Sequence, residues 1–353
     1  MNNSEILFNE LPGARGNIGE IILNRPHALN TLTTDMCRQL REHLIQWQQD
    51  DNIKAVIIRG EGDKAFCAGG DVKTLYNNAD NKTAVMEFFR QEYSMNRVIF
   101  HFTKPYIAFL DGITMGGGAG ISVPGSHRVA TEKFSFAMPE TLIGFFPDVG
   151  AGYFLNKCPG KTGYYLGLTG ATIRATDALA LNLINHVIAQ KYISEAIKTL
   201  CDTPFGPRDF SIVTDIISSF RISVHEPDIL LNQMLIEECF AFKEMEAIIY
   251  ALQAANTSWS LKTRENLLKR SPTSLKVTLA HLYQAIPLSF DEVMQQEFNM
   301  AVAFMHSQDF YEGVRAVLVD KDQKPTWQPG QLSEVSEETV KKFFIQVECG
   351  LEI

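Results

Sequence analysis

A run of glycines, Gly116 to Gly118 and then Gly120, constrains the fold of this chain more than any other stretch. The run follows the apolar, strand-like segment Tyr106–Leu110. Glycines after a strand let the backbone turn sharply and let its N–H groups approach a ligand closely. The spacing is not GxGxxG, and no Lys-Ser/Thr pair follows, so nucleotide-binding loops fit poorly. Close packing of a helix against the strand is the structural alternative.

A second glycine turn favours the ligand-binding interpretation. Ala68, Gly69, Gly70 and Asp71 follow another small-residue segment that starts at Ala65. Two such turns could supply two backbone N–H donors that converge on one carbonyl oxygen. Removing one donor of this kind typically costs roughly 2.7–4 kcal/mol of transition-state stabilisation. The two turns therefore indicate a site where an oxyanion forms, as in acyl transfer.

Two carboxylates follow in apolar surroundings and are candidates for acid–base chemistry or nucleophilic attack. Glu140 comes after Ala-Met-Pro and before Thr-Leu-Ile, and Asp148 comes after Phe-Phe-Pro. Poor solvation there would raise the pKa of each carboxyl group. The alternative for Glu140 is a first-turn residue that interacts with a helix dipole, and for Asp148 it is an N-cap. Either residue can cap a helix and still face a ligand.

A third acid, Glu92, lies on a predicted helix from about Thr83 to Phe102. Phe88 and Phe89 precede it by three or four residues and share its side of the helix. A glutamate on a face that leans toward the core needs a polar partner. A polar group of a substrate would serve, and a solvated edge position is the alternative.

The chain divides by pattern into an α/β part and a helical part. Short strands alternate with helices up to about Ala189, which indicates parallel pairing. Long helical patterns follow, and Thr203–Pro207 breaks both kinds of element. We predict a core over residues 1–202 that carries the active site and a helical region over residues 203–353.

Composition excludes several classes of function. A net charge of -9 without a Lys/Arg block argues against nucleic-acid binding. Six cysteines without CxxC spacing predict reduced thiols and no metal site. No apolar run approaches the roughly 18 residues that span a bilayer, and the first residues show no signal-peptide pattern. We therefore expect a protein that is soluble and cytoplasmic.

Three stretches together resemble the crotonase (enoyl-CoA hydratase/isomerase) superfamily: Ala65–Val72, Gly112–Gly120 and Ala137–Glu140. The resemblance implies an α/β fold, a crotonase-like ββα spiral with a helical C-terminal region. It places an oxyanion hole on the N–H groups of Gly70 and Gly117. It also implies an acyl-CoA substrate and no further cofactor, because coenzyme A is part of the substrate. The coenzyme A contacts that it implies are Arg25, Ala28, Ala68, Asp71 and Val72.

One difference from the superfamily pattern distinguishes between its subfamilies. Hydratases of the superfamily carry a glutamate three residues after the oxyanion glycine, where this chain has Gly120, so hydration by paired carboxylates is disfavoured. In four stretches the chain instead resembles the 3-hydroxyisobutyryl-CoA hydrolases of valine catabolism: Phe66–Asp71, Met138–Thr141, Phe146–Gly150 and Glu312–Asp322. In that family Glu92, Gly117, Glu140 and Asp148 match substrate-binding positions. Glu140 and Asp148 match the catalytic positions, with Glu140 as nucleophile or general base. Enoyl-CoA hydration or isomerisation and non-catalytic acyl-CoA binding are the alternatives, and assembly into a homo-oligomer stays open.

Overall fold

The computed structural model describes residues 4–347 and 350–351. The chain forms two compact units, and each draws on segments that are far apart in the sequence. Unit 1 contains the residues up to Gly70, Ser94–Phe136 and Ile173–Pro227. Unit 2 contains Asp71–Tyr93, Ala137–Thr172 and the residues from Asp228 onward. The predicted division of the sequence at residues 202/203 follows different segments and stays a prediction.

Unit 1 is built on a six-stranded sheet. Its strand order is β1-β2-β3-β5-β7-β10, and every neighbouring pair except β1–β2 is parallel. The strands are β1 (Ile6–Leu11), β2 (Asn17–Leu23), β3 (Ile53–Gly60), β5 (Tyr106–Leu110), β7 (His127–Ala130) and β10 (His186–Val187). The antiparallel β1–β2 hairpin was not predicted, because the apolar residues Ile6–Phe8 form only a short run between polar residues. Only Ile6 of β1 is fully buried, as suits an edge strand.

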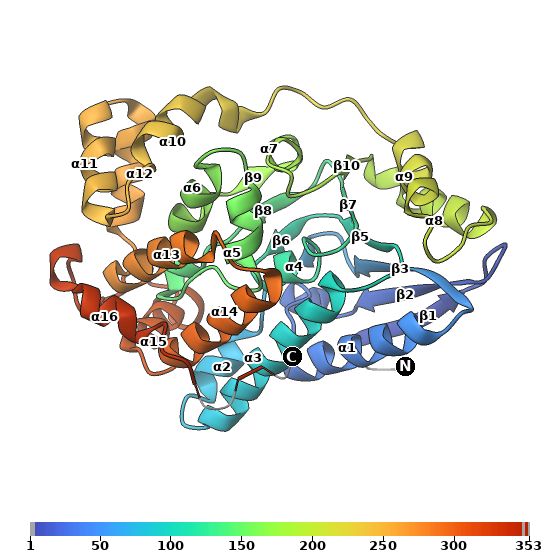
Figure 1. The fold of residues 1–353 in the computed structure, drawn as a ribbon, viewed down its shortest axis with the longest axis horizontal. Helices are drawn as coiled ribbons and strands as arrows, with labels where there is room; N and C mark the ends of the chain where they lie inside the picture. Colours follow the sequence, from blue (N-terminus) through green and yellow to red (C-terminus); the bar gives the residue numbers. More distant parts are fainter. Residues whose placement is uncertain (1–3, 348–349, 352–353) are drawn as a thin grey trace. The chain divides into compact units, whose positions relative to one another are not determined.

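A smaller sheet gives the fold its spiral form. Its order is β4-β6-β8-β9, with β4 at Ala65–Cys67, β6 at Ile113–Met115, β8 at Ser135–Ala137 and β9 at Ile173–Arg174. Along the chain, β3, β5 and β7 each pass directly to β4, β6 and β8. Each turn of the spiral therefore adds one strand to the larger sheet and one strand to the smaller sheet. Helices follow the β3–β4 and β5–β6 pairs (Figure 1). The predicted α/β fold with ββα turns is confirmed.

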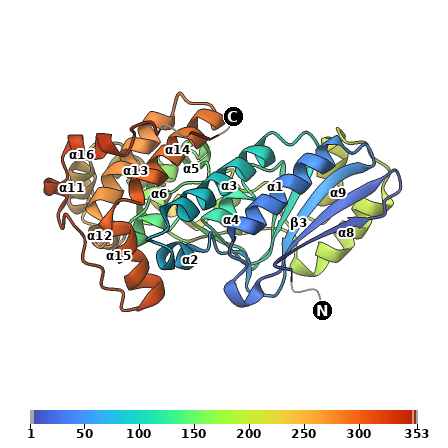
Figure 2. The same cartoon turned by 90° about the horizontal axis from the view of Figure 1, so that it is seen from below.

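Helices cover both faces of the larger sheet. Successive residues of a strand point to opposite faces. Ile18 packs in a core with residues of α8 (Ile193–Asp202) and α9 (Phe210–Ser219). Its neighbour Gly19 faces α1 (Thr34–Gln49), where a Cβ atom would lie 2.6 Å from the Trp47 ring. Figure 2 shows α1 on one side of the sheet and α8 and α9 on the other.

Helix α1 illustrates how local sequence sets an element. Thr33 has extended backbone, and its hydroxyl accepts a hydrogen bond from the Met36 N–H at 3.3 Å, so it is the N-cap of this helix. Helix α4 (Gly117–Gly120) and α7 (Ala175–Ala180) complete the helices that lie wholly in unit 1. Helix α3 (Lys82–Phe100) begins in unit 2 and ends in unit 1.

Unit 2 is almost entirely helical. Its core helix is α13 (Pro272–Ala285), which packs against α5, α6, α11 and α16. Antiparallel neighbours α11 and α12 lie side by side (Figure 1). The helices are α2 (Val72–Asn77), α5 (Ala151–Phe154), α6 (Thr162–Thr169), α10 (Gln233–Cys239), α11 (Met245–Ala255), α12 (Ser258–Leu268), α13, α14 (Phe290–Phe304), α15 (Gln308–Val314) and α16 (Glu337–Lys342). The helical C-terminal region is confirmed.

The last helix is shorter than predicted. The sequence suggests a helix over Ser336–Glu348, whereas α16 ends at Lys342 and residues 345–347 are irregular. Glu348 lies outside the described residues. Ser336 is the N-cap, and its hydroxyl accepts from the Thr339 N–H at 3.1 Å.

Candidate active site

The two glycine turns lie side by side in unit 1. They follow β4 and β6, which pair in parallel, so the carboxyl ends of both strands meet at one edge. A Cβ atom on Gly118 would lie 2.2 Å from the Cys67 carbonyl oxygen, and one on Gly69 would lie 3.8 Å from the Gly117 nitrogen. Gly69 also has a φ of +122°, a conformation that favours glycine. The close packing that was the structural alternative is therefore present, and it brings the two turns next to each other. The ligand-binding interpretation stays a prediction.

Residues predicted to bind coenzyme A lie on a third turn beside the first two. The Ala68 N–H donates to the Leu29 carbonyl at 3.0 Å, which ties the turn at Ala68 to the segment Arg25–Asn30. Asn30 is fully buried, and its amide donates to the Glu61 and Ala65 carbonyls. Ala28 is partly exposed. Arg25 is largely buried, and it pairs with Glu5 at 2.9 Å and donates to the Thr31 carbonyl at 2.7 Å.

The remaining two predicted coenzyme A contacts open α2. The Asp71 carboxylate accepts from the Thr74 N–H at 3.2 Å and caps this helix, and Val72 is its first residue. Both side chains are partly exposed. Asp71 therefore has a structural role as an N-cap, which is compatible with a ligand contact by its backbone.

Three predicted acids are buried in unit 2. Glu92 comes from α3, Glu140 begins a 3₁₀ helix (Glu140–Ile143) after β8, and Asp148 precedes α5. Their exposed fractions are 2%, 7% and 6%. Glu92 Oε1 and Glu140 Oε2 are buried without a hydrogen-bond partner. A buried carboxyl oxygen without a partner is costly, and such atoms mark sites where a ligand supplies the missing bond.

Electrostatics bind these three carboxyls into one group. Burial raises the pKa of Glu92, and the charges of Asp148 and Glu140 raise it further. Burial also raises the pKa of Glu140, with a further increase from Asp148. Burial raises the pKa of Asp148 to about 7, and the hydroxyl of Tyr93 limits the rise by donating a hydrogen bond to Oδ2 at 2.7 Å. Because burial and like charges both disfavour the ionised forms, these three carboxyls keep their protons to higher pH than ordinary carboxyls do.

Two further residues, one bound to an acid of this group and one to the backbone after Asp148, were not predicted. Tyr93 is fully buried next to Glu92 on α3 and binds Asp148 directly. Glu297 of α14 is fully buried and accepts from the Gly150 N–H at 2.6 Å, just after Asp148. A signal for Glu297 was present, because Val293, Glu297 and Phe304 share one helical stripe that is otherwise apolar.

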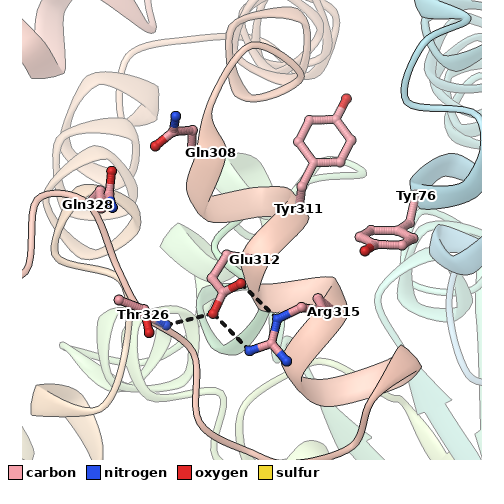
Figure 3. Close-up of a pocket in the computed structure, with 7 residues that line it drawn as sticks. All are labelled: Tyr76, Gln308, Tyr311, Glu312, Arg315, Thr326 and Gln328. Carbon is pink, nitrogen blue, oxygen red and sulfur yellow. Dashed lines mark hydrogen bonds and ion pairs between the residues drawn. The ribbon is translucent and has the colours of Figure 1, made fainter.

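The cavity in Figure 3 is a different feature of unit 2. It has a volume of about 470 Å³ and contains none of the predicted site residues. The Arg315 guanidinium pairs there with Glu312 at 2.8 Å, and it also pairs with Asp320 and Asp322. Its charge is therefore already compensated. The lining residues are Tyr76, Gln308, Tyr311, Glu312, Arg315, Thr326 and Gln328.

The glycine turns and the buried carboxyls each have chemistry that suits reactions of an acyl group. Backbone donors at paired glycine turns stabilise an oxyanion, and carboxyls with raised pKa values exchange protons near neutral pH. No cluster of three or more potential metal ligands occurs in residues 4–347 and 350–351. Within the same ranges, no helix has the length and apolarity to cross a membrane.

The ββα spiral is the fold expected for an acyl-CoA enzyme of the crotonase type. A family model described as enoyl-CoA hydratase/isomerase matches residues 18–344, and the chain belongs to this family. The solved structure of a carnitinyl-CoA dehydratase from Mycobacterium thermoresistibile matches with a TM-score of 0.91 and 34% identity, covering 99% of both chains. An enoyl-CoA hydratase from Rhodobacter sphaeroides 2.4.1 matches with a TM-score of 0.89 and 30% identity over 99% of this chain and all of the other.

Sequence relatives identify the branch of the family. The chain is 42% identical to the 3-hydroxyisobutyryl-CoA hydrolase of Danio rerio over 97% of this chain and 89% of the relative. It is also 42% identical to the Homo sapiens enzyme of that name, over 94% of this chain and 86% of the relative. The chain therefore belongs with the 3-hydroxyisobutyryl-CoA hydrolases, as the sequence predicted.

The expected cytoplasmic location is wrong on this comparison. The relatives from Danio rerio, Homo sapiens, Gallus gallus and Bos taurus are all named as mitochondrial. The expectation rested on composition and on the pattern of the first residues, and the composition of a folded body does not specify its compartment.

Proposed function

We propose that this chain hydrolyses the thioester of 3-hydroxyisobutyryl-CoA to 3-hydroxyisobutyrate and coenzyme A. The observation that carries the proposal is the buried group of Glu92, Glu140 and Asp148, in which burial raises every pKa. Relatives that are 40–42% identical over nearly the whole chain and bear the name of this hydrolase support the substrate.

Backbone donors begin the proposed reaction. The Gly70 and Gly117 N–H groups donate to the thioester oxygen as it gains negative charge. Support comes from unit 1, where the two turns follow adjoining parallel strands and pack closely. The segment around Arg25 and Ala28, with Ala68, Asp71 and Val72, holds the coenzyme A portion. Fixed N–H donors need no reorganisation when the charge appears, which is why this arrangement lowers the barrier.

Glu140 supplies the nucleophile. Its ionised carboxylate attacks the thioester carbon, the C–S bond breaks, and coenzyme A leaves as a thiolate. The product is a mixed anhydride between Glu140 and the acyl group. Water then opens the anhydride at the Glu140 carbon, which returns the carboxylate and releases 3-hydroxyisobutyrate. An unpartnered buried oxygen on Glu140 supports this role, because poor solvation makes a carboxylate more nucleophilic.

Asp148 and Glu92 complete the proposed chemistry. When Glu140 is ionised, its charge favours the protonated forms of its neighbours. Protonated Asp148 gives its proton to the leaving thiolate and recovers it from the attacking water. Glu92, whose Oε1 lacks a partner, accepts a hydrogen bond from the 3-hydroxyl group of the substrate. One buried group thereby supplies a nucleophile, a residue that gives and recovers a proton, and a specificity contact.

Hydration of an enoyl-CoA is the second candidate, because the two solved structures above carry the names of a hydratase and a dehydratase. A hydratase needs two acids that flank the double bond. In this chain the first of those positions is Gly120, which has no side chain. Asp148 would have to replace the missing acid. Non-catalytic binding of acyl-CoA is the third candidate, and it requires no ionisable group at Glu140.

Isotopic labelling tests the nucleophilic role. The enzyme turns over its substrate many times in water labelled with oxygen-18, and the peptide that contains Glu140 is then weighed by mass spectrometry. We expect the label in Glu140, because water opens the anhydride at that carbon. The peptide that contains Asp309, another buried carboxylate, is the internal control and stays unlabelled. Labelled product with an unlabelled Glu140 peptide would contradict this route.

A further inference from the structure

Glu297 has no role in the proposed reaction, yet three hydrogen-bond donors converge on it. Its Oε2 accepts from the Gly150 N–H at 2.6 Å. Its Oε1 accepts from the Gly152 N–H at 3.0 Å and contacts His281 Nε2 at 3.0 Å. The exposed fraction of Glu297 is 0%. Burying a carboxyl group this deeply is costly unless its oxygens are hydrogen-bonded, and these three donors supply the bonds.

The segment held by Glu297 is the turn that presents Asp148. Val149 has a φ of +54° and Gly150 has a φ of +90°. A β-branched residue rarely adopts the left-handed region, so this turn requires contacts from outside to persist. Gly150 also has no room for a side chain, since a Cβ atom there would lie 2.6 Å from the Phe290 ring. Glu297 and Phe290, both on α14, therefore fix the backbone from Gly150 onward, directly after Asp148 and Val149.

His281 in turn fixes Glu297. The histidine is fully buried on α13, and its Nε2 faces the Glu297 carboxylate. A carboxylate only accepts hydrogen bonds, so Nε2 carries the proton. The ring also packs on the held segment, because a Cβ atom on Gly152 would lie 2.6 Å from His281 Cε1. Helices α13 and α14 thus hold the Asp148 turn through one connected set of bonds.

Charge adds a second effect to this geometry. The groups that face Asp148 are Tyr93 and Glu92 from α3, Glu140 from the 3₁₀ helix and Glu297 from α14. The negative charge of Glu297 raises the pKa of Asp148, in addition to the larger effect of burial. It also raises the pKa of Glu140. Removing this charge should therefore lower both pKa values.

We propose that Glu297, held by His281, is a positioning residue of this active site that fixes the Asp148–Gly150 turn. The inference rests on the proposed function for its kinetic consequences. Glu297 acts through Asp148 and touches no substrate atom. An error of 1 Å in the position of a catalytic group can reduce a rate by about 10²-fold.

The kinetic test compares three variants across pH. In Glu297→Gln, an NH2 group replaces one carboxylate oxygen, so one of the two glycine N–H groups loses its acceptor. The negative charge is lost as well. We expect kcat to fall by roughly 10²-fold and the acid limb of the kcat/KM profile to move to lower pH. Glu297→Asp keeps the charge but is too short to reach both glycines. It should lower kcat while the acid limb stays in place.

Asp309→Asn is the matched control. Asp309 is another buried carboxylate of unit 2 that accepts from a backbone N–H, that of Gln328 at 2.8 Å. This variant should lower Tm and leave the acid limb unchanged. His281→Gln, which retains a donor toward Glu297, should restore most of the activity that His281→Leu loses. If the Glu297 variants lower Tm but keep the wild-type kcat and acid limb, Glu297 is only structural and the proposal fails.

A second readout separates this inference from the proposed function. Carbon-13 NMR of labelled aspartate carboxyls follows the titration of Asp148, assigned with Asp148→Asn, and needs no substrate. We expect the pKa of Asp148 to fall in Glu297→Gln and to stay in Asp309→Asn. If the pKa of Asp148 falls in Glu297→Gln but the wild-type enzyme does not hydrolyse the thioester, only the proposed function is overturned. In folded Glu297→Gln, an Asp148 signal unchanged in both its titration midpoint and its carboxyl chemical shift would overturn the positioning role whatever the activity.

Discussion

The Glu140 side chain contributes little to the stability of the folded protein. Its Oε2 is buried without a partner, and burial raises its pKa. We therefore predict that Glu140→Gln lowers kcat by roughly 10³-fold or more, as loss of a nucleophile does, while the fold persists. The amide has nearly the same shape and no charge to bury, so Tm at pH 8 should be at least that of the wild type. Thiol release and thermal unfolding measure the two effects, and full activity in the variant would refute catalysis by this residue.

Asp148 should make the stability depend on pH. Its pKa is about 7 in the folded protein, above the ordinary value, so the folded state binds a proton more tightly than the unfolded state does. The resulting stability is present below about pH 4 and is lost as the pH rises through about 7. Asp148→Asn keeps an acceptor for Tyr93 and removes the charge.

We therefore predict that Asp148→Asn raises the free energy of unfolding at pH 8 by an amount on the order of a few kcal/mol, with a smaller gain at pH 5. Denaturant unfolding at the two pH values checks this. A variant that is less stable than the wild type at pH 8 would show that the ionised carboxylate stabilises the fold.

The sequence indicated Glu92, Glu140 and Asp148 because acids in apolar runs stand out. Tyr93 did not stand out, since a tyrosine beside Phe88 and Phe89 looks like ordinary core. Its role depends on where Asp148 lies, and 55 positions separate the two residues in the chain. Such a contact is a property of the folded chain, and no local pattern reports it.

At the scale of elements, the paired glycine turns depend on the close approach of α4 to β4. A Cβ atom on Gly118 would lie 2.2 Å from the Cys67 carbonyl oxygen. We predict that Gly118→Ala separates the turns, lowers kcat by roughly 10²-fold and costs about 1–3 kcal/mol of stability. In the control Gly206→Ala, a Cβ atom would meet only the movable Asp209 carboxylate at 3.3 Å, so activity should be retained. Equal kinetics for the two variants would refute this role of the packing.

Elements with strong local signals were predicted well. The sequence suggests helices over Glu244–Ala255 and Phe290–Met305, and the structure has them at Met245–Ala255 and Phe290–Phe304. The β1–β2 hairpin escaped prediction because β1 obtains its stability from pairing with β2 and from one buried residue, Ile6. Edge strands of this kind carry little periodicity of their own.

At the scale of the whole molecule, segments distant in sequence form each unit. Residues 71–93 and 137–172 join the C-terminal helices in unit 2, so Glu92, Glu140 and Asp148 belong to the same unit as Glu297. A division by composition follows the order of the chain and cannot reveal this exchange. The resemblance to a family supplied the fold, while the supporting residues of α13 and α14 became visible only in the structure.

The central claim is that this spiral fold hydrolyses a thioester, because Gly120 removes one acid of the hydratase pair and Glu140 retains the other. The most direct measurement exposes one enzyme preparation to 3-hydroxyisobutyryl-CoA and to crotonyl-CoA, and records free thiol and loss of the enoyl absorbance. We predict rapid thiol release from the hydroxyacyl substrate and little change in the enoyl signal. Rapid loss of the enoyl absorbance without thiol release would contradict the account.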